Sequence, residues 1–276
     1  MRYTTFAIAA ILSLAISVPS ASAQKLLKTD GWGSLTGKVT LDGAIPAIVN
    51  LVPKMKIHRD GPICCLLGKK NEKIDLTWVV DPKTKGVANV VVWVRAPQDT
   101  YLAIKPAKQK RKDTVIIDQP HCQFVPRVSV FNPVYFDGKK EVPTGQKLIL
   151  RNSAVVAHNI RATAHPIYNE DNSFNVNVPA KSEITKTFNP QPLPVKLQCD
   201  FHTWMSAQLF VFNHPYYAIT DANGNFTIPE VPAGAEIHIM AWHEGVGYVT
   251  PGGKTGGVAR ALKAGKNVID FTVKAP

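Results

Sequence analysis

Four side chains of the kinds that hold a redox metal follow one another in a fixed order. His158 is followed 41 residues later by Cys199, and His202 and Met205 come next at intervals of three residues. Two imidazoles, a thiolate and a thioether are the donors of a mononuclear copper centre, in which two histidines and the cysteine form a trigonal base and the methionine is a weak axial ligand. Soft sulfur holds Cu(I), and imidazole suits both oxidation states. The set therefore predicts a site that exchanges one electron with little rearrangement.

Strands are needed to bring these donors to one point. Residues Val195 to Gln198 are expected to form a strand that delivers Cys199, and Gln208 to Phe212 to form the strand that leaves. The loop between them turns the next two donors back toward the cysteine. His158 must come from the end of a distant strand, so a folded scaffold would hold the metal.

Simpler interpretations exist for each residue. A lone buried histidine or methionine is usually structural, and Cys199 is also a candidate for a disulfide. Zinc accepts cysteine and histidine but seldom a thioether. A nucleophilic pair of Cys199 and His202 is disfavoured because the two are so close in sequence and no oxyanion-stabilising motif is recognisable. The order of four soft donors favours copper over these alternatives.

The rest of the sequence is typical of an all-β protein. Apolar residues occur in short alternating or continuous runs between Gly, Pro and Asn, without a long stretch at helical spacing. Val90 to Val94 is a continuous apolar run, as expected of a strand buried on both faces, and Lys147 to Arg151 is also expected to be a strand. The 21 prolines fit turns, edges and loops. Sandwiches or barrels are the expected architecture.

Length and composition exclude several classes of protein. The 276 residues suffice for about two domains of ordinary size. With 45% hydrophobic and 19% charged residues and a mean hydropathy of −0.04, the chain is expected to be neither wholly disordered nor a polytopic membrane protein. The 32 Lys and Arg against 20 Asp and Glu give a net charge of +12, which favours acidic partners.

The N-terminus has the features of an export signal. Arg2 precedes the 13-residue apolar run Phe6 to Val18, and Ala21 to Ala23 forms an A-x-A cleavage site. Residues 1–23 are thus predicted to be a cleaved signal peptide, because the run is shorter than the roughly 20 residues of a membrane anchor. We expect a periplasmic or secreted protein that has no integral membrane segment after cleavage.

Residues 114–212 resemble the cupredoxins, the type 1 blue copper proteins, and the Cys-x2-His-x2-Met spacing is similar to the short ligand loop of amicyanins. The motifs that carry the resemblance, besides the ligands, are Phe124 to Pro126, Thr144 to Asn152 and Ala157 to Asn159. The resemblance implies a Greek-key β-sandwich with one copper bound by His158, Cys199, His202 and Met205.

The same resemblance gives Asn159 the role of tying the two ligand segments together, next to the metal site. The sequence departs from the family in having no prolines in the ligand loop and an insertion at Asn132 to Glu141. Trp204, between two ligands, is expected to pack beside the copper, with an exposed docking patch as the alternative.

The regions on either side, residues 24–113 and 213–276, have a different resemblance. Thr220 to Gly234 and the following Glu236 to Trp242 are similar to the carboxypeptidase regulatory-like, or prealbumin-like, β-sandwich, and Gly37 to Gly43 looks like an early strand of that fold. Two arrangements remain open. Either the two flanks form one discontinuous sandwich into which the copper region is inserted, or they are separate pieces.

Three further cysteines remain after Cys199 is assigned. Export favours one disulfide, which joins Cys122 to Cys64 or Cys65. Adjacent cysteines in a strand point to opposite faces, so only one of the two reaches Cys122, and Cys64 is our candidate. A second metal site formed by these cysteines and His121 is the alternative.

The basic stretch Lys105 to Lys112 is expected to be an exposed, solvated linker, with a polyanion site as the alternative. The predicted function is an exported one-electron carrier that docks with an acidic redox protein. We expect no nucleic-acid partner. We also expect no enzyme activity, since no second copper site with its own histidines is recognisable. The alternatives are a non-redox copper-binding or cell-surface adhesive module and, on the amicyanin analogy alone, a partner in a periplasmic oxidation system.

Overall fold

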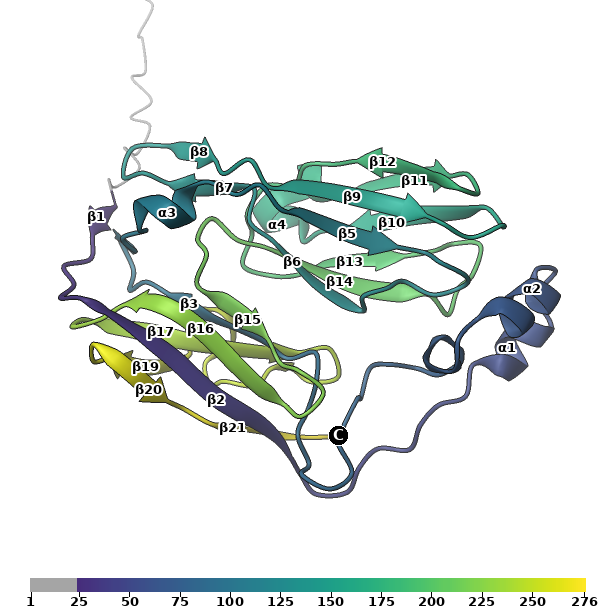
Figure 1. Cartoon of the computed structure of the whole chain (residues 1–276), viewed down its shortest axis with the longest axis horizontal. Coiled ribbons are helices and arrows are strands. Elements are labelled where there is room, and N and C mark those ends of the chain that lie inside the picture. The colour runs from purple at the N-terminus through teal and green to yellow at the C-terminus, as the bar shows by residue number, and fades with distance from the viewer. Residues whose placement is uncertain (1–23) are drawn as a thin grey trace, which may run out of the picture.

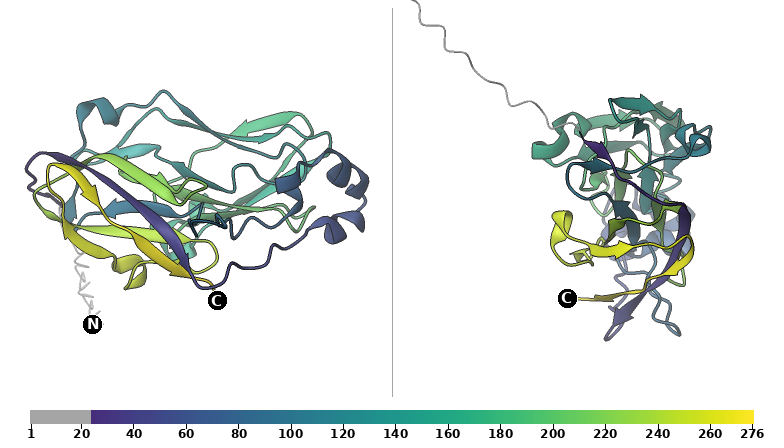
Figure 2. Two further views of the ribbon diagram at one scale, coloured as in Figure 1. Left: turned by 60° about the horizontal axis from the view of Figure 1, so that its bottom comes forward. Right: turned by 90° about the vertical axis from the view of Figure 1, so that its left-hand side faces the viewer.

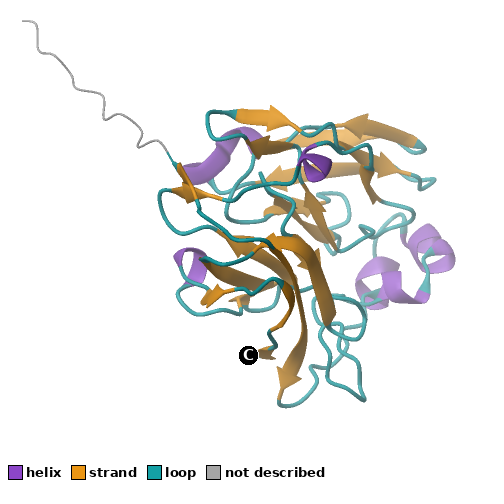
Figure 3. Cartoon of the chain, turned by 60° about the vertical axis from the view of Figure 1, so that its left-hand side comes forward, coloured by secondary structure: helices purple, strands orange, loops and turns teal. Residues whose placement is uncertain are grey.

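The computed structural model describes residues 24–276, and the predicted signal peptide, residues 1–23, lies outside the described residues. Strands dominate this part of the chain, and the helices are short (Figures 1 and 3), so the expected all-β class is confirmed. Between residues 24 and 276 there is no helix with the length and hydropathy needed to cross a bilayer.

One β-sandwich is formed by residues 114–211. Its five-stranded sheet has the order β11-β10-β13-β14-β6, and its three-stranded sheet has the order β12-β9-β5. Within these sheets, β6 pairs with β14 and β5 with β9 in parallel, and the other neighbours are antiparallel. The strands are β5 (Thr114–Asp118), β6 (Val128–Phe131), β9 (Lys147–Asn152), β10 (His158–Thr163), β11 (Phe174–Val178), β12 (Ser182–Thr185), β13 (Val195–Gln198) and β14 (Ser206–Val211). The insertion expected at Asn132 to Glu141 contains β7 (Val134–Phe136) and the first residue of β8 (Glu141–Pro143), and these two strands pair as a hairpin.

The remaining large sheets combine strands from both flanks. One has the order β15-β3-β17-β18 with β19 on β17, and the other has the order β16-β2-β20 with β21 on β2. β2 (Trp32–Asp42) and β3 (Val91–Arg95) precede the first sandwich in the chain. The others follow it: β15 (Tyr217–Ile219), β16 (Asn225–Pro232), β17 (Glu236–His243), β18 (Gly247–Tyr248), β19 (Val258–Ala261), β20 (Gly265–Val268) and β21 (Phe271–Lys274). Figure 2 shows β2 beside the C-terminal strands, with which it pairs in parallel.

The two sandwiches pack face to face through an apolar layer. Val90, Val92 and Val94 point into the core between the flanking sheets, while Val91 and Trp93 face Phe210 and other side chains of β6 and β14. β3 is therefore buried on both faces, as the continuous apolar run from Val90 to Val94 predicts.

Between β2 and β3 the chain makes a helical excursion, residues 50–77, here called the cap segment. It contains α1 (Val52–Lys56), α2 (Gly61–Leu67) and the 3-10 helix η1 (Lys70–Lys73). A proline stands in the first turn of both α-helices, where its fixed backbone angle favours helix initiation. Met55 and Cys64 are buried and join the core of the first sandwich. In Figure 1 the two helices lie away from the flanking sheets, beyond the right-hand end of the molecule's strands.

This segment corrects one premise of the sequence analysis. Cys64 and Cys65 lie on helix α2, not on a strand, so their side chains point about 100° apart around the helix axis and not to opposite faces of a sheet. Helices of five and seven residues are too short to display a helical period in the sequence.

The basic stretch from Lys105 to Lys112 is not the exposed, solvated linker that the sequence predicts. It begins with α3 (Pro106–Gln109), and Lys105 and Lys108 form ion pairs of 2.6 and 3.3 Å with Glu230 on β16. Arg111 donates a hydrogen bond to the hydroxyl of Tyr217. The stretch is therefore held against the flanking sheets. The remaining short elements are β1 (Lys25–Leu26), β4 (Thr100–Tyr101), α4 (Pro166–Asn169), η2 (Glu170–Asn172) and η3 (Gly253–Thr255).

Candidate metal centre

Three of the four predicted ligands meet at one end of the first sandwich. His158 is the first residue of β10 and Cys199 follows the last residue of β13, and because these strands are antiparallel neighbours both residues lie at the same end. His202 lies in the loop between β13 and β14. Cys199 Sγ is 3.7 Å from Nδ1 of His158 and 3.7 Å from Nδ1 of His202. Each of the three residues is at most 2% exposed.

Both imidazoles present an unprotonated nitrogen to the sulfur. Nε2 of His158 lies 2.6 Å from the carbonyl oxygen of His121, and Nε2 of His202 lies 3.2 Å from Oδ2 of Asp60. A carbonyl and a carboxylate only accept hydrogen bonds, so each neutral ring carries its proton on Nε2 and a lone pair on Nδ1. A single S–H group can donate to only one of two lone pairs. A cation between the three atoms satisfies both.

The spacing of the three atoms fits a metal. Zinc-type bonds of about 2.3 Å to sulfur and about 2.0–2.1 Å to nitrogen, at angles near 115–120°, separate sulfur from nitrogen by about 3.7 Å. The donor atoms of His158, Cys199 and His202 all lie within 4.8 Å of one another. This set is therefore able to hold a metal ion with little movement.

Met205 closes the loop that contains Cys199 and His202. The backbone N–H of Cys199 donates to the carbonyl of Met205 at 3.3 Å, and the N–H of Met205 donates to the carbonyl of His202 at 2.8 Å. The Met205 side chain is completely buried in the core of the first sandwich, to which Cys199 also belongs. The structure thus places the thioether residue on the same tight turn as the cysteine and the second histidine.

Asn159 connects the two segments that carry the ligands. Its Oδ1 accepts a hydrogen bond from the N–H of Asp200 at 2.6 Å, and its Nδ2 donates to Asp200 Oδ2 at 2.9 Å and to Asn175 Oδ1 at 2.7 Å. The side chain is buried. These bonds fix the residues next to His158 and Cys199 relative to each other, which limits rearrangement of the site.

Burial sets the protonation of the metal-free site. It lowers the pKa of His158, and it lowers the pKa of His202 to about 4, to which repulsion from His158 and His58 also contributes. Burial raises the pKa of the Cys199 thiol. At neutral pH both imidazoles are therefore free to bind a metal, whereas the cysteine must lose its proton when a metal binds.

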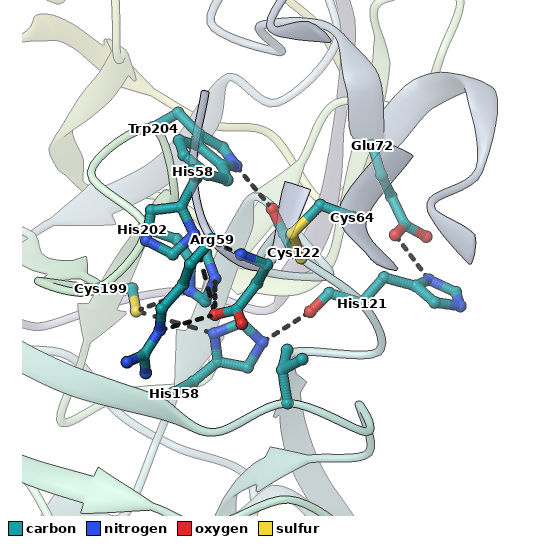
Figure 4. Close-up of a disulfide and its surroundings, with 12 residues drawn as sticks. His58, Arg59, Cys64, Glu72, His121, Cys122, His158, Cys199, His202 and Trp204 are labelled. Carbon is teal, nitrogen blue, oxygen red and sulfur yellow. Dashed lines mark hydrogen bonds and ion pairs between the residues drawn. A yellow bond between two sulfur atoms is a disulfide. The ribbon is translucent and has the colours of Figure 1, made fainter. Parts of the chain in front are cut away.

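The cap segment supplies residues that the sequence analysis did not connect with the site (Figure 4). Besides Asp60, the ring of His58 lies with its centroid 4.6 Å from that of His202 and 5.6 Å from that of Trp204. Trp204 is half-buried against the core and donates from its indole N–H to the carbonyl of Cys122 at 3.0 Å. It packs beside the ligands, which agrees with the structural role expected for it.

A disulfide joins the cap segment to the first sandwich. Cys64 and Cys122 are bonded with an S–S distance of 1.99 Å, and Cys65 is a free, half-buried cysteine in the described part of the chain. The bond uses two of the thiols of the alternative second metal site, so that alternative is wrong. His121, next to Cys122, holds Glu72 of the cap segment through Nδ1 at 2.7 Å. The Sγ atoms of Cys64 and Cys122 each lie within 4.8 Å of a ring nitrogen of His202.

No protein-family model matches the chain, and no curated protein matches it. Among solved structures, the chain is similar to a purple cupredoxin from Nitrosopumilus maritimus. The sequences are 16% identical, and the match covers 37% of this chain and 100% of that chain, with a TM-score of 0.26.

Proposed function

We propose that this chain is an exported type 1 copper protein that carries single electrons. His158, Cys199 and His202 would hold the copper through two Nδ1 atoms and one Sγ, and Met205 would be the axial ligand. When bound, the copper supplies a one-electron couple. The observation that carries the proposal is the pair of Nδ1 lone pairs that face one buried sulfur at 3.7 Å each.

The donor set favours copper over zinc. A structural zinc site normally has four cysteine, histidine or carboxylate ligands, whereas a thioether is a ligand of copper. The group around Cys199 offers two imidazoles and one sulfur, and the next buried donor on the loop is Met205. The hydrogen bonds of His121, Asp60 and Asn159 hold the ligands in place before metal binds. Such preorganisation suits a site that changes charge without changing shape.

The surrounding sheets would serve as a scaffold. We infer that residues 24–113 and 213–276 form one discontinuous, prealbumin-like domain into which the cupredoxin-like residues 114–212 are inserted, because strands from both flanks pair within the same sheets. In this scheme the flanking domain carries the cap segment to the copper. The partner would be an acidic redox protein, and the protein would act in the periplasm or outside the cell.

The visible spectrum of the copper-loaded protein tests the proposal. Addition of Cu(II) is expected to give an intense thiolate-to-copper band that ascorbate bleaches and air or ferricyanide restores. Cys199→Ala should abolish this band, and Cys65→Ala, which removes the free thiol of the cap segment, should keep it. A colourless protein that retains zinc in preference to copper would instead indicate a structural metal site or an adhesive module.

A further inference from the structure

We propose that the acidic redox partner docks on the exposed surface of the cap segment formed by Lys56, Ile57 and Arg59 around His58, here called the cap face. This inference rests on the proposed electron-transfer function and adds to it the place of docking. It follows from the burial of the proposed ligands, from the His58 ring that covers His202 and from the exposed positive charge of the cap segment.

The ligands themselves cannot touch a partner. His158, His202 and Met205 are 0% exposed, and Cys199 is 2% exposed. An electron must therefore cross a layer of protein, and its transfer rate falls steeply with the thickness of that layer. Electron transfer to a partner is therefore fastest where the protein layer over the ligands is thin and contains a conjugated ring.

His58 provides such a covering. Its ring stacks obliquely on His202, with the centroids 4.6 Å apart, and its side chain is 25% exposed. Asp60 contacts Nε2 of His202 with the same carboxylate oxygen that lies 3.8 Å from Nε of Arg59. One ring and one carboxylate thus separate the buried ligand from the surface of the cap segment, and Figure 4 shows Arg59 beside this cluster.

Five cations of the cap segment are exposed to solvent, whereas each of its carboxylates has a partner within the protein. The exposed cationic residues of residues 50–77 are Lys54, Lys56, Arg59, Lys69 and Lys70. Each of the three carboxylates has a partner within the protein: Asp60 contacts His202, Glu72 contacts His121 and Asp75 lies 3.8 Å from Arg127. The exposed cations outnumber the carboxylates, and the carboxylates are paired, so the solvent-facing side of the cap segment is positive and attracts an acidic surface.

An apolar residue stands among these cations. Ile57, which is 89% exposed, directly precedes His58, and Arg59, which is 82% exposed, directly follows it. A small apolar centre with a charged rim is the pattern of a transient protein interface. The exposed residues of the ligand loop lack this charge, because Asp200 is acidic and is paired with Arg161. The cap face therefore suits an acidic partner better than the ligand loop does.

Two small oxidants of opposite charge test the cap face. Ferricyanide and tris(phenanthroline)cobalt(III) each take one electron from Cu(I), giving ferrocyanide or the cobalt(II) complex and Cu(II). The charge-reversal variant Lys56→Glu/Arg59→Glu should oxidise about tenfold more slowly with ferricyanide at low ionic strength and faster with the cobalt complex, and both effects should vanish at high salt. The matched control is Lys266→Glu/Lys274→Glu, which makes the same change of net charge at two exposed lysines of β20 and β21.

The outcomes separate the two proposals. A copper band that persists in both variants, with rates changed only by the cap variant, supports the cap face. Equal changes in both variants, or none in the cap variant, would overturn docking there while leaving the copper site intact. A wild-type protein without the thiolate-to-copper band would overturn the proposed function, and the docking surface with it.

Discussion

The carboxylate of Asp60 lies 3.2 Å from Nε2 of His202, although the two residues are 142 positions apart in the chain. Asp60 belongs to the cap segment, which leaves the flanking sheets, and His202 belongs to the ligand loop of the other sandwich. The contact fixes the proton of His202 on Nε2 and leaves Nδ1 free for a metal. The flanking region is thus a structural part of the candidate metal site.

Removing the charge of Asp60 is expected to raise the reduction potential of the bound copper. A carboxylate beside a ligand stabilises Cu(II) more than Cu(I). The Asp60 carboxylate would be separated from the copper by the imidazole of His202, at a distance of about 7–8 Å. A unit charge at that distance contributes on the order of 2 kcal/mol at an effective dielectric constant of about 20, or roughly 100 mV for a one-electron couple. Redox titration of the visible band in Asp60→Asn checks the shift. Asp42→Asn, at the exposed end of β2, is the control. Equal potentials in the two variants would contradict the assigned role.

The Cys64–Cys122 disulfide is expected to hold the cap segment over the site. The disulfide joins residues 58 positions apart, and in the chain-entropy model a crosslink over a loop of this length raises the free energy of unfolding by about 4 kcal/mol. Cys64→Ser/Cys122→Ser should lower the free energy of unfolding by about this amount and should speed removal of copper by a chelator. Urea denaturation and the decay of the visible band measure the two effects. Cys65→Ser should change neither, and unchanged chelation in the double variant would mean that other contacts hold the cap segment.

The ion pair of Arg127 and Glu244, at the junction of the sandwiches, should be costly to break on one side only. Arg127 donates two hydrogen bonds to the carboxylate of Glu244, at 2.7 and 3.0 Å, and is buried. Arg127→Met is expected to lose up to about 3 kcal/mol, because it leaves the Glu244 carboxylate, whose side chain is 15% exposed, with the neutral Gln208 amide in place of a cation. Arg127→Met/Glu244→Met should recover most of that loss. Urea denaturation of both variants measures it, and equal losses would show that Arg127 acts through other contacts.

His243 is expected to make the metal-free protein less stable in acid. Its ring is buried, with its centroid 4.2 Å from that of Trp78, and burial lowers its pKa to about 4. In the unfolded chain the histidine takes up a proton near pH 6.5, whereas in the folded protein it does so only near pH 4. Burial of the neutral ring therefore contributes fully to the free energy of unfolding above pH 6.5, and this contribution is lost as the pH falls toward 4. The loss reaches about 3 kcal/mol.

Unfolding of metal-free His243→Gln at several pH values between 4 and 7.5 isolates this effect. The variant should show a shallower loss of stability than the wild type across that interval, and His165→Gln, at the start of α4, is the control. Parallel curves for the wild type and His243→Gln would assign the acid sensitivity to other groups.

Local patterns in the sequence sufficed for several of the strands and for the turn that holds Cys199, His202 and Met205. The alternating and continuous apolar runs predicted β9, β13 and β14, because strand burial repeats every two residues or covers both faces. The spacing of three residues between Cys199, His202 and Met205 is also a local property, since one tight turn contains them all. The short helices of the cap segment have no comparable period, and the Lys105 to Lys112 stretch was predicted as a linker because its partner Glu230 lies far along the chain.

The sequence by itself determined which donor atoms this protein offers and that strands would present them, since residue type and short spacing encode both. Only the tertiary structure decided what surrounds those atoms. Asp60, His58 and His121 reach the ligands through contacts that span tens to more than a hundred residues. Such contacts depend on how two sandwiches and a helical excursion pack against each other, and this packing arises from the burial of apolar faces that no local pattern pairs with one another.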